Sequence, residues 1–557
     1  MSPRHAVDDD ALSKALSAVP GELDREVARA ENGGAFGIKI LTDMLRDYAA
    51  ARSVADPAFE QRDSWAALRS SAELATYYVN ALETESGGEV RAWVEYLGVG
   101  FGYEAEGGEE AYPHDWIAAF CLALICREDK QLRYLHALAR TLRQNAQTPY
   151  VQALDALWAD VAGLAETTET AHGPDGAAAD VVPPGRHADE IALLNAIGRG
   201  DAAAFGTGLA ALIEAHREQA KPDHVRHLIA WEPLALAVLA HDSGLKVEVE
   251  TDYLPHRLIT GEGPKKVEAG GRVVRPPFAQ ERAAAAIAFF DKNPPDRVGF
   301  PLSPTIITTQ RPNAFRSAAG HLLESFSLRP MVDPEVTELR LWTDLRLASQ
   351  AWTAAFTLAS APEDTPVTVT LAGRSEELPA SGPVSCHGPW YYGTAIACAL
   401  AARATEDLAV LREVTDETLA AGGAHADTKA YVRGLRALLR GEDPRAHVDA
   451  ALSTTSGDDH WECLCNPRVR LLDRLVADDV EGFNRVLAEA LELYLQYYSS
   501  PTQEDEAEGQ YSLDALALAC AAHDDKGWKI EVDSDYLPEW IVTGALVGTP
   551  ADLTPYA

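Results

Sequence analysis

The chain has 557 residues, of which 47% are hydrophobic and 24% charged, a globular balance with enough apolar material for two cores. Its 85 acidic and 48 basic residues give a formal net charge of −37, which disfavours binding to nucleic acid or to an anionic membrane. The same surplus equally fits an acidic surface that serves solubility alone, so the charge does not name a partner.

The N-terminal residues 1–34 are polar and acidic, and they lack the basic, apolar and cleavage-site order of a signal peptide. They have no counterpart that can be found later in the sequence, so we expect an N-terminal extension of one or two helices. No apolar run reaches the ~18–20 residues that a membrane span needs. The seven cysteines follow no disulfide framework, which predicts reduced thiols and a cytoplasmic protein.

Most segments carry helical periodicity. Residues 65–81 place apolar side chains at spacings of three and four, and residues 117–138 do the same on either side of a polar turn at 127–131. Asp201 is expected to cap a helix, and Asp479 stands at the corresponding place 278 positions later. The chain is therefore predicted to be mostly α-helical.

Two kinds of short segment alternate apolar and polar residues, as a strand does. One is residues 89–97, matched by residues 366–371. The other is residues 246–250, matched by residues 529–533. We expect the two kinds to form a small two-stranded piece in each helical unit.

A tandem duplication organises the chain. Residues 247–261 read VEVETDYLPHRLITG, and residues 530–544 read IEVDSDYLPEWIVTG, 283 positions later. The similarity extends upstream through Trp65 and Trp342 to Asp56-Pro57 and Asp333-Pro334, with an offset that drifts slowly as loop insertions accumulate. The fold class predicted is mostly α, with two homologous helical domains in tandem, each with a short two-stranded β element. The predicted division is an extension (1–34), a first repeat (35–262), a linker (263–311), a second repeat (312–545) and a tail (546–557).

The sequence shows no clear set of catalytic residues. The sequence has no phosphate-binding glycine loop, no nucleophile elbow and no His-Glu-x-x-His zinc motif. Cys463 and Cys465 near His460, and the Cys386-His387 pair, lack the second ligand pair that a structural zinc site needs. The prediction is a protein without enzymatic activity, metal or cofactor.

The duplication also keeps two His-Asp pairs, His241-Asp242 and His523-Asp524. Such a pair could transfer protons. A histidine close to a helix C-terminus also complements the helix dipole, and we favour this second interpretation.

The repeated Asp-Tyr-Leu-Pro signature has two interpretations. Its proline suits the first turn of a final helix, whose apolar side chains would fasten the segment to the core. Its acidic edge (Glu248, Glu250, Asp252) could in addition contact a partner. We favour the architectural role.

The duplicated ending resembles the closing segment of the Immunity protein 49 family. The residues that carry the resemblance are Glu248, Val249, Asp252, Tyr253, Leu254, Pro255, Glu531, Val532, Asp535, Tyr536, Leu537 and Pro538. The resemblance implies a mostly α-helical fold and a gene beside a toxin of a bacterial polymorphic toxin system. It implies binding and neutralisation of the cognate toxin domain, often a nuclease. It supplies no catalytic residues.

The leading hypothesis is therefore an immunity protein that inhibits a basic toxin domain stoichiometrically, with no nucleic-acid or membrane partner and an oligomeric state left open. A general α-helical interaction scaffold is the first alternative, and an enzyme that uses His241 or His523 is the second. Charge density selects eight acidic residues as candidates to face the toxin: Glu104, Glu106, Glu109, Glu110, Glu504, Asp505, Glu506 and Glu508.

Overall fold

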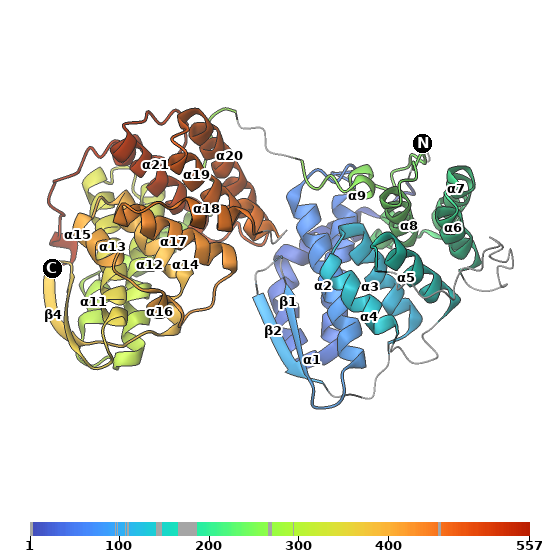
Figure 1. The fold of residues 1–557 in the computed structure, drawn as a ribbon, viewed down its shortest axis with the longest axis horizontal. Coiled ribbons are helices and arrows are strands. Elements are labelled where there is room, and N and C mark those ends of the chain that lie inside the picture. Colours follow the sequence, from blue (N-terminus) through green and yellow to red (C-terminus); the bar gives the residue numbers. More distant parts are fainter. Residues whose placement is uncertain are drawn as a thin grey trace. The chain divides into compact units, whose positions relative to one another are not determined.

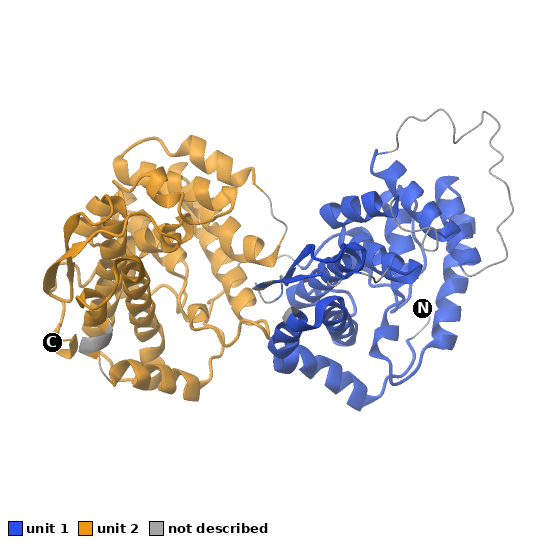
Figure 2. Ribbon diagram, turned by 90° about the horizontal axis from the view of Figure 1, so that it is seen from below, with its two compact units in different colours: residues 1–266 blue, residues 267–557 orange. Residues whose placement is uncertain are grey.

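The computed structural model describes residues 4–556 apart from 95, 97–98, 106, 108–110, 141–147, 165–186, 266–269, 293 and 455–457. The chain forms two compact units, residues 1–266 and 267–557 (Figure 2). Each unit is mostly helical, and among the described residues each carries one antiparallel two-stranded sheet. The predicted fold class of two helical domains in tandem, each with a small β element, is confirmed.

The first unit is built on a long N-terminal helix that packs along a second one (Figure 1). Its helices are α1 (Asp9–Arg52), α2 (Arg62–Glu83), α3 (Pro113–Cys126), α4 (Asp129–Ala139), α5 (Pro149–Val161), α6 (Ala188–Gly198), α7 (Ala202–Gln219), α8 (Trp231–Asp242) and α9 (His256–Thr260).

The second unit repeats this plan, with α12 and α13 as the pair of long packed helices. Its helices are α10 (Gln280–Asp291), α11 (Pro294–Gly299), α12 (Arg311–Val332), α13 (Glu338–Ser360), α14 (Pro389–Ala401), α15 (Thr405–Leu411), α16 (Asp416–Leu419), α17 (Ala426–Arg440), α18 (Arg445–Leu452), α19 (Asn466–Val476), α20 (Val480–Tyr498), α21 (Leu513–Lys526) and α22 (Glu539–Val542).

Residues 1–34 belong to the folded first unit. They supply the first half of α1, which changes direction at Gly34, where a φ of 57° is a left-handed conformation that suits glycine. In the second unit two separate helices, α10 and α12, take the place of this one long helix. The five-part division of the chain stays a prediction, whereas the boundary between the two compact units falls after residue 266.

The helices follow the apolar periodicity of the sequence. In α2, Leu68, Ala72, Ala75 and Val79 are all buried, as their spacing predicts. The Asp201 carboxylate accepts a hydrogen bond of 3.0 Å from the Ala204 amide and begins α7. Asp479 does the same for α20 by accepting from the Gly482 amide at 2.9 Å. Side-chain capping of this kind satisfies amides that the first helical turn leaves unpaired.

The strand prediction is only half right. Residues 89–94 (β1) and 366–371 (β3) are strands, but each pairs with the segment that follows it, β2 (Val99–Glu104) or β4 (Arg374–Pro379). Residues 246–250 and 529–533, expected as their partners, lie in no sheet. Their apolar and polar residues alternate because one side packs on the core: Val247 and Val249 contact it, whereas Glu248 is exposed.

Within each unit, one continuous apolar core joins the central helices to the closing segment. Trp116 and Tyr253 are fully buried in the first unit, as are Trp342 and Tyr536 in the second. Among the described residues, no helix is both long and apolar enough to cross a membrane.

Candidate partner-binding site

The Asp-Tyr-Leu-Pro signature lies in the duplicated ending of each unit, residues 247–261 and 530–544, which we call the closing segment. Tyr253 and Leu254 are 0% and 4% exposed, and Tyr536 and Leu537 are 2% and 7% exposed. Pro255 and Pro538 each stand immediately before a short helix, α9 or α22. The apolar part of the signature therefore holds the last segment on the core, in agreement with the architectural interpretation.

An arginine in a left-handed conformation fastens each closing segment. Arg127 has a φ of 56° just after α3. Its guanidinium donates to the carbonyl oxygens of Leu258 (2.9 Å) and Ile259 (2.6 Å) and to the Asp242 carboxylate (2.9 Å). One side chain thus ties α3 to α8 and to the end of α9.

Arg403 makes the same connection in the second unit. Its φ is 48°, and it follows α14. Its guanidinium donates to the Ile541 carbonyl oxygen, to that of Val542 at 2.8 Å, and to the Asp524 carboxylate at 2.9 Å. Burial opposes ionisation of Asp524, but the hydrogen bonds from Arg403 and His523 lower its pKa overall.

These contacts explain the two duplicated His-Asp pairs. His241 and Asp242 end α8, and His523 and Asp524 lie in the last turn of α21, as the helix-end interpretation expected. In each pair the histidine Nδ1 lies within 3.2 Å of the neighbouring carboxylate. Because an arginine already binds that carboxylate, the pair acts in fastening the closing segment.

A second arginine covers the polar edge of each signature. Arg4 donates to the Asp252 carbonyl oxygen at 2.7 Å and to that of Ser53 at 2.8 Å, at the end of α1. Arg275 donates to the Asp535 carbonyl oxygen at 3.1 Å and to that of Ser327 at 3.5 Å, in the last turns of α12. Arg4 and Arg275 each stand five positions before the first residue of a helix.

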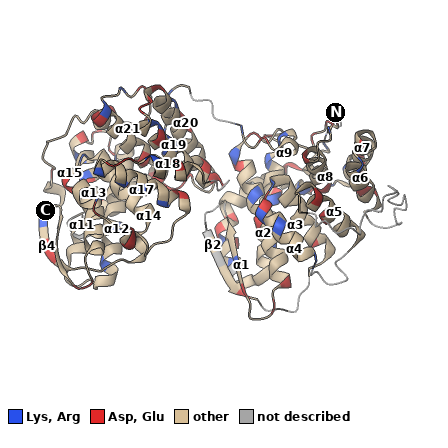
Figure 3. Ribbon diagram, in the orientation of Figure 1, with Lys and Arg blue, Asp and Glu red and all other residues tan. Residues whose placement is uncertain are grey.

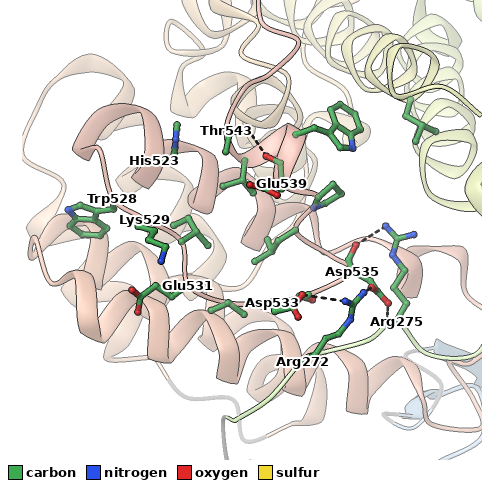
Figure 4. Close-up of a pocket in the computed structure, with 18 of the residues that line it drawn as sticks. Arg272, Arg275, His523, Trp528, Lys529, Glu531, Asp533, Asp535, Glu539 and Thr543 are labelled. Carbon is green, nitrogen blue, oxygen red and sulfur yellow. Dashed lines mark hydrogen bonds and ion pairs between the residues drawn. The ribbon is translucent and has the colours of Figure 1, made fainter.

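We call the segments that carry these arginines, residues 4–8 and 272–279, the straps. The two straps correspond to each other, but the comparison of the two halves of the sequence did not reveal this. They share only the arginine and its distance from the next helix. In the second unit the strap also pairs by its backbone: the Val273 amide donates to the Asp533 carbonyl at 3.1 Å, and the Asp535 amide donates to the Val273 carbonyl at 3.2 Å. Figure 4 shows Arg272 and Arg275 reaching Asp533 and Asp535 from this strap.

A hollow of about 950 Å³ lies between the strap and the closing segment of the second unit (Figure 4). Both charged and apolar residues line it. The charged residues on it are Arg272, Arg275, Lys529, Glu531, Asp533, Asp535 and Glu539, and the apolar ones include Trp528, Ile530, Val532, Leu537 and Trp540.

The acidic residues that line the hollow are only partly neutralised. Arg272 pairs with both Asp533 and Asp535, whereas Glu531 and Glu539 are exposed and form no salt bridge with a described residue. Trp540, the residue after Glu539, is half-buried and also lines the hollow. Such a hollow, with apolar lining residues and two available carboxylates, suits the side chain of a lysine or arginine from a partner.

The signature's acidic residues differ in what they contact. Glu248 is exposed and pairs with Lys246 at 2.7 Å, and Asp252 is half-buried beneath the first strap. Their counterparts Glu531 and Asp535 both line the hollow of the second unit.

The acidic candidates selected by charge density lie in two separate places. Glu104 ends β2 and is exposed, while Glu106, Glu109 and Glu110 lie outside the described residues. In the second unit, Glu504, Asp505, Glu506 and Glu508 follow α20. A role of these residues in binding stays a prediction.

Two of the acidic residues in the loop after α20 contact other residues of the same unit. Asp505 pairs with Arg282 of α10, and the Glu508 carboxylate accepts a 3.3 Å hydrogen bond from the Tyr498 hydroxyl. Glu504 and Glu506 are exposed. Burial first, and then the charges of Glu508 and Glu506, raise the pKa of Glu324 on α12, so the loop places its negative charge close to this helix.

The cysteines considered as metal ligands are buried. Cys463 and Cys465 are 1% and 4% exposed, and the Cys465 Sγ lies 3.6 Å from His460 Nδ1. Burial raises the pKa of Cys465 to about 11, which keeps the thiol neutral and disfavours the thiolate that zinc needs.

Comparison with protein families matches the model of Immunity protein 49 twice, over residues 56–258 and 333–541, which together cover well over half of the chain. The chain belongs to the Immunity protein 49 family. The resemblance deduced from the closing segment is thereby confirmed, as is the tandem duplication. No match was found among curated proteins or among solved structures.

Both matched stretches of Immunity protein 49 include the arginine after α3 or α14 and nearly all of the closing segment. Both begin after the strap and after α1 or α12. The straps are therefore parts of the folded units that neither the family match nor the sequence repeat reveals.

Proposed function

We propose that this chain binds and neutralises a cognate toxin domain by forming a stoichiometric complex with it in the cytoplasm of the producing cell. The observation that carries the proposal is the match to an immunity-protein family in both units. An inhibitor of this kind blocks its target by contact and needs no catalytic group of its own. The seven cysteines are all buried free thiols, which suits a reducing compartment.

The charge of the chain favours a basic toxin, and a nuclease in particular. Nucleases hold phosphate with basic residues, so their active surfaces attract acidic proteins. A net charge of −37 accelerates association with such a partner and disfavours binding to nucleic acid itself. Figure 3 shows Asp and Glu residues on helices throughout both units.

The hollow of the second unit is the proposed docking point. Glu531 and Glu539 would pair with a lysine or arginine of the toxin, and Trp540 would contact the aliphatic part of that side chain. The exposed Glu504 and Glu506 form an alternative docking surface in the second unit, and Glu104 is a separate candidate in the first unit.

The experiment is titration calorimetry of the full chain against the toxin domain encoded beside it, at low and at high salt. We expect a complex with one or two toxin domains per chain, whose affinity falls as salt increases. Absence of binding at low salt would reject that partner and favour an interaction scaffold without a toxin partner.

Charge reversals then locate the surface. The double variant Glu531→Lys, Glu539→Lys is expected to weaken binding at least ten-fold and to reduce its salt dependence. The matched variant Glu504→Lys, Glu506→Lys changes the charge by the same amount at the other surface. If only this second pair weakens binding, the docking point is the loop after α20 rather than the hollow.

A further inference from the structure

Three potential metal ligands converge in the first unit. The His187 Nδ1 lies 3.7 Å from a carboxylate oxygen of Glu190 and 3.6 Å from one of Glu232. The three ligand atoms lie within 4.8 Å of one another. His187 immediately precedes α6, Glu190 is in its first turn, and Glu232 is in the first turn of α8.

The spacing fits a tetrahedral ion. With metal–ligand bonds of about 2.1 Å, ligand atoms around zinc lie about 3.4 Å apart. The two distances from His187 need to contract by only a few tenths of an ångström, and the two carboxylates, whose oxygens lie within 4.8 Å of each other, need to approach by about 1.4 Å at most. His187 Nδ1 is buried and makes no hydrogen bond to a described residue. A buried imidazole nitrogen without a hydrogen bond is available as a ligand.

A buried tyrosine provides a second, independent observation. Tyr150 is 1% exposed, its ring stacks on His187 with centroids 4.7 Å apart, and its hydroxyl has no hydrogen-bond partner among the described residues. A hydroxyl left without a partner beside two carboxylates and an imidazole indicates that a ligand completes this site.

The duplication shows what occupies the same place in the second unit. Helix α6 begins at Ala188 and α19 at Asn466, an offset of 278 that also relates Asp201 to Asp479. By this offset His187 corresponds to Cys465 and Glu190 to Arg468. The His-Asp pairs at the ends of α8 and α21 have an offset of 282, which makes Asp514 the counterpart of Glu232.

In the second unit a built-in cation fills this place. Arg468 is 6% exposed, its Nη1 lies 3.4 Å from the Asp514 carboxylate, and its Nη2 lies 3.7 Å from the Cys465 Sγ. Its guanidinium lies 4.7 Å from the ring centroids of both Trp390 and Tyr431. The second unit thus places a permanent positive charge between the counterparts of His187 and Glu232.

The first unit replaces that arginine by Glu190, and the neutral thiol by an imidazole. We infer that the first unit binds a divalent transition-metal ion, Zn²⁺ being the best fit, through His187, Glu190 and Glu232. Imidazole nitrogen and carboxylate oxygen are ligands of zinc, and a ligand set with two carboxylates and one neutral histidine balances its charge of +2. The ion would clamp the start of α6 to the start of α8, as Arg468 clamps α19 to α21.

The test uses the full chain, stripped with a chelator and then incubated with ZnCl₂. Metal is counted by elemental analysis after gel filtration, and affinity is measured by titration calorimetry. We expect one tightly bound Zn²⁺ per chain and a higher thermal midpoint for the first unit. His187→Ala, Glu190→Gln and Glu232→Gln should each weaken binding at least ten-fold.

A matched control separates this site from surface histidines. His224 and His227 stack on each other, 5.2 Å apart, in the same unit. The variant His224→Ala, His227→Ala should keep the bound ion. Wild-type protein that binds no Zn²⁺, or ion retained in His187→Ala and lost in this control, would overturn the inference.

Exchanging the residues of the two corresponding sites gives a sharper test. Glu190→Arg copies the arrangement of the second unit, so it should abolish Zn²⁺ binding while the chain stays folded by circular dichroism. The double variant Cys465→His, Arg468→Glu copies the first unit and should bind a second Zn²⁺. A folded double variant that binds only one ion would contradict the correspondence between the two sites. None of these readouts involves a toxin, so they are independent of the proposed function.

Discussion

Arg403 and Asp524 meet across 121 positions of the sequence, with the guanidinium Nε 2.9 Å from a carboxylate oxygen. The same guanidinium donates to the carbonyl oxygens of Ile541 and Val542 at the end of α22, and the Ile541 oxygen also accepts from the Gly544 amide at 3.0 Å. Arg127 and Asp242 repeat the arrangement in the first unit. Two copies that agree in every one of these arginine contacts indicate that the closing segment depends on them.

Replacing Arg403 by glutamine is therefore expected to destabilise the second unit by about 2–4 kcal/mol, because the Asp524 carboxylate and the Val542 carbonyl lose a charged donor. The free energy of unfolding would be followed in urea. Arg412→Gln is the matched control, since Arg412 is half-exposed and forms an ion pair with its neighbour Glu413. We expect it to cost less than about 0.5 kcal/mol. Equal losses in the two variants would refute a structural role for Arg403.

The hydrogen bonds of the strap arginines are expected to stabilise each unit. Arg275→Ala should lower the free energy of unfolding of the second unit by about 1–3 kcal/mol, because it removes hydrogen bonds to Asp535 and Ser327. Arg4→Ala should do the same in the first unit. Hydrogen exchange would report faster exchange in the closing segment of the altered unit alone. Arg25→Ala, at an exposed position on α1, is the control and should leave the exchange unchanged.

A close approach between two glycines predicts a steric effect. A Cβ atom on Gly422 would lie 2.3 Å from the Gly388 Cα and 2.8 Å from the Ser385 carbonyl oxygen, so the backbone would have to move. Gly422→Ala should cost about 1–3 kcal/mol. Its neighbour Gly423 has nothing within 4 Å of such an atom, and Gly423→Ala should be close to neutral. A comparison of urea midpoints for the two variants tests this directly.

A buried histidine predicts how stability depends on pH. His387 is 0% exposed, and its Nδ1 accepts a hydrogen bond of 3.1 Å from the Val384 amide. Burial lowers the pKa of His387 to about 4, compared with about 6.5 in the unfolded chain. The unfolded state therefore binds more protons between these values, and stability falls as the pH decreases from about 6.5 to about 4.

The loss attributable to His387 approaches about 3 kcal/mol at the acidic end of that range. Unfolding in urea at several pH values would measure the slope. His387→Gln should flatten it, whereas His447→Gln should not. An unchanged slope in His387→Gln would exclude this histidine as its source.

Much of the fold was predictable because helical periodicity and duplication are both properties of local sequence. The spacing in α2 and the capping of α7 by Asp201 needed no knowledge of distant contacts. The pairing of residues 246–250 with a strand was wrong, because alternation reports one buried side and does not say what covers it. Val247 and Val249 pack on the hydrophobic core, and the partner of β1 is the segment that follows it.

The contacts around the candidate sites were less predictable. Arg127 and Arg403 could be aligned, but their hydrogen bonds to carbonyls more than 130 positions away leave no trace in the sequence. The metal cluster carries one local signal, the His-x-x-Glu spacing of His187 and Glu190, which places both side chains at the start of one helix. Glu232 is distant in the sequence, so only the fold brings it to them.

The positions of the straps determine where the chain can be divided without separating a strap from its unit. Each unit contains its own strap, its own hairpin and its own closing segment, and the second strap is made from residues that lie between the two family matches. A cut between residues 280 and 332 would leave the first copy whole and take the strap from the second. A cut at 266 leaves both straps with their own units, so we expect a chain with the two units in the opposite order to keep each strap beside the closing segment that it contacts.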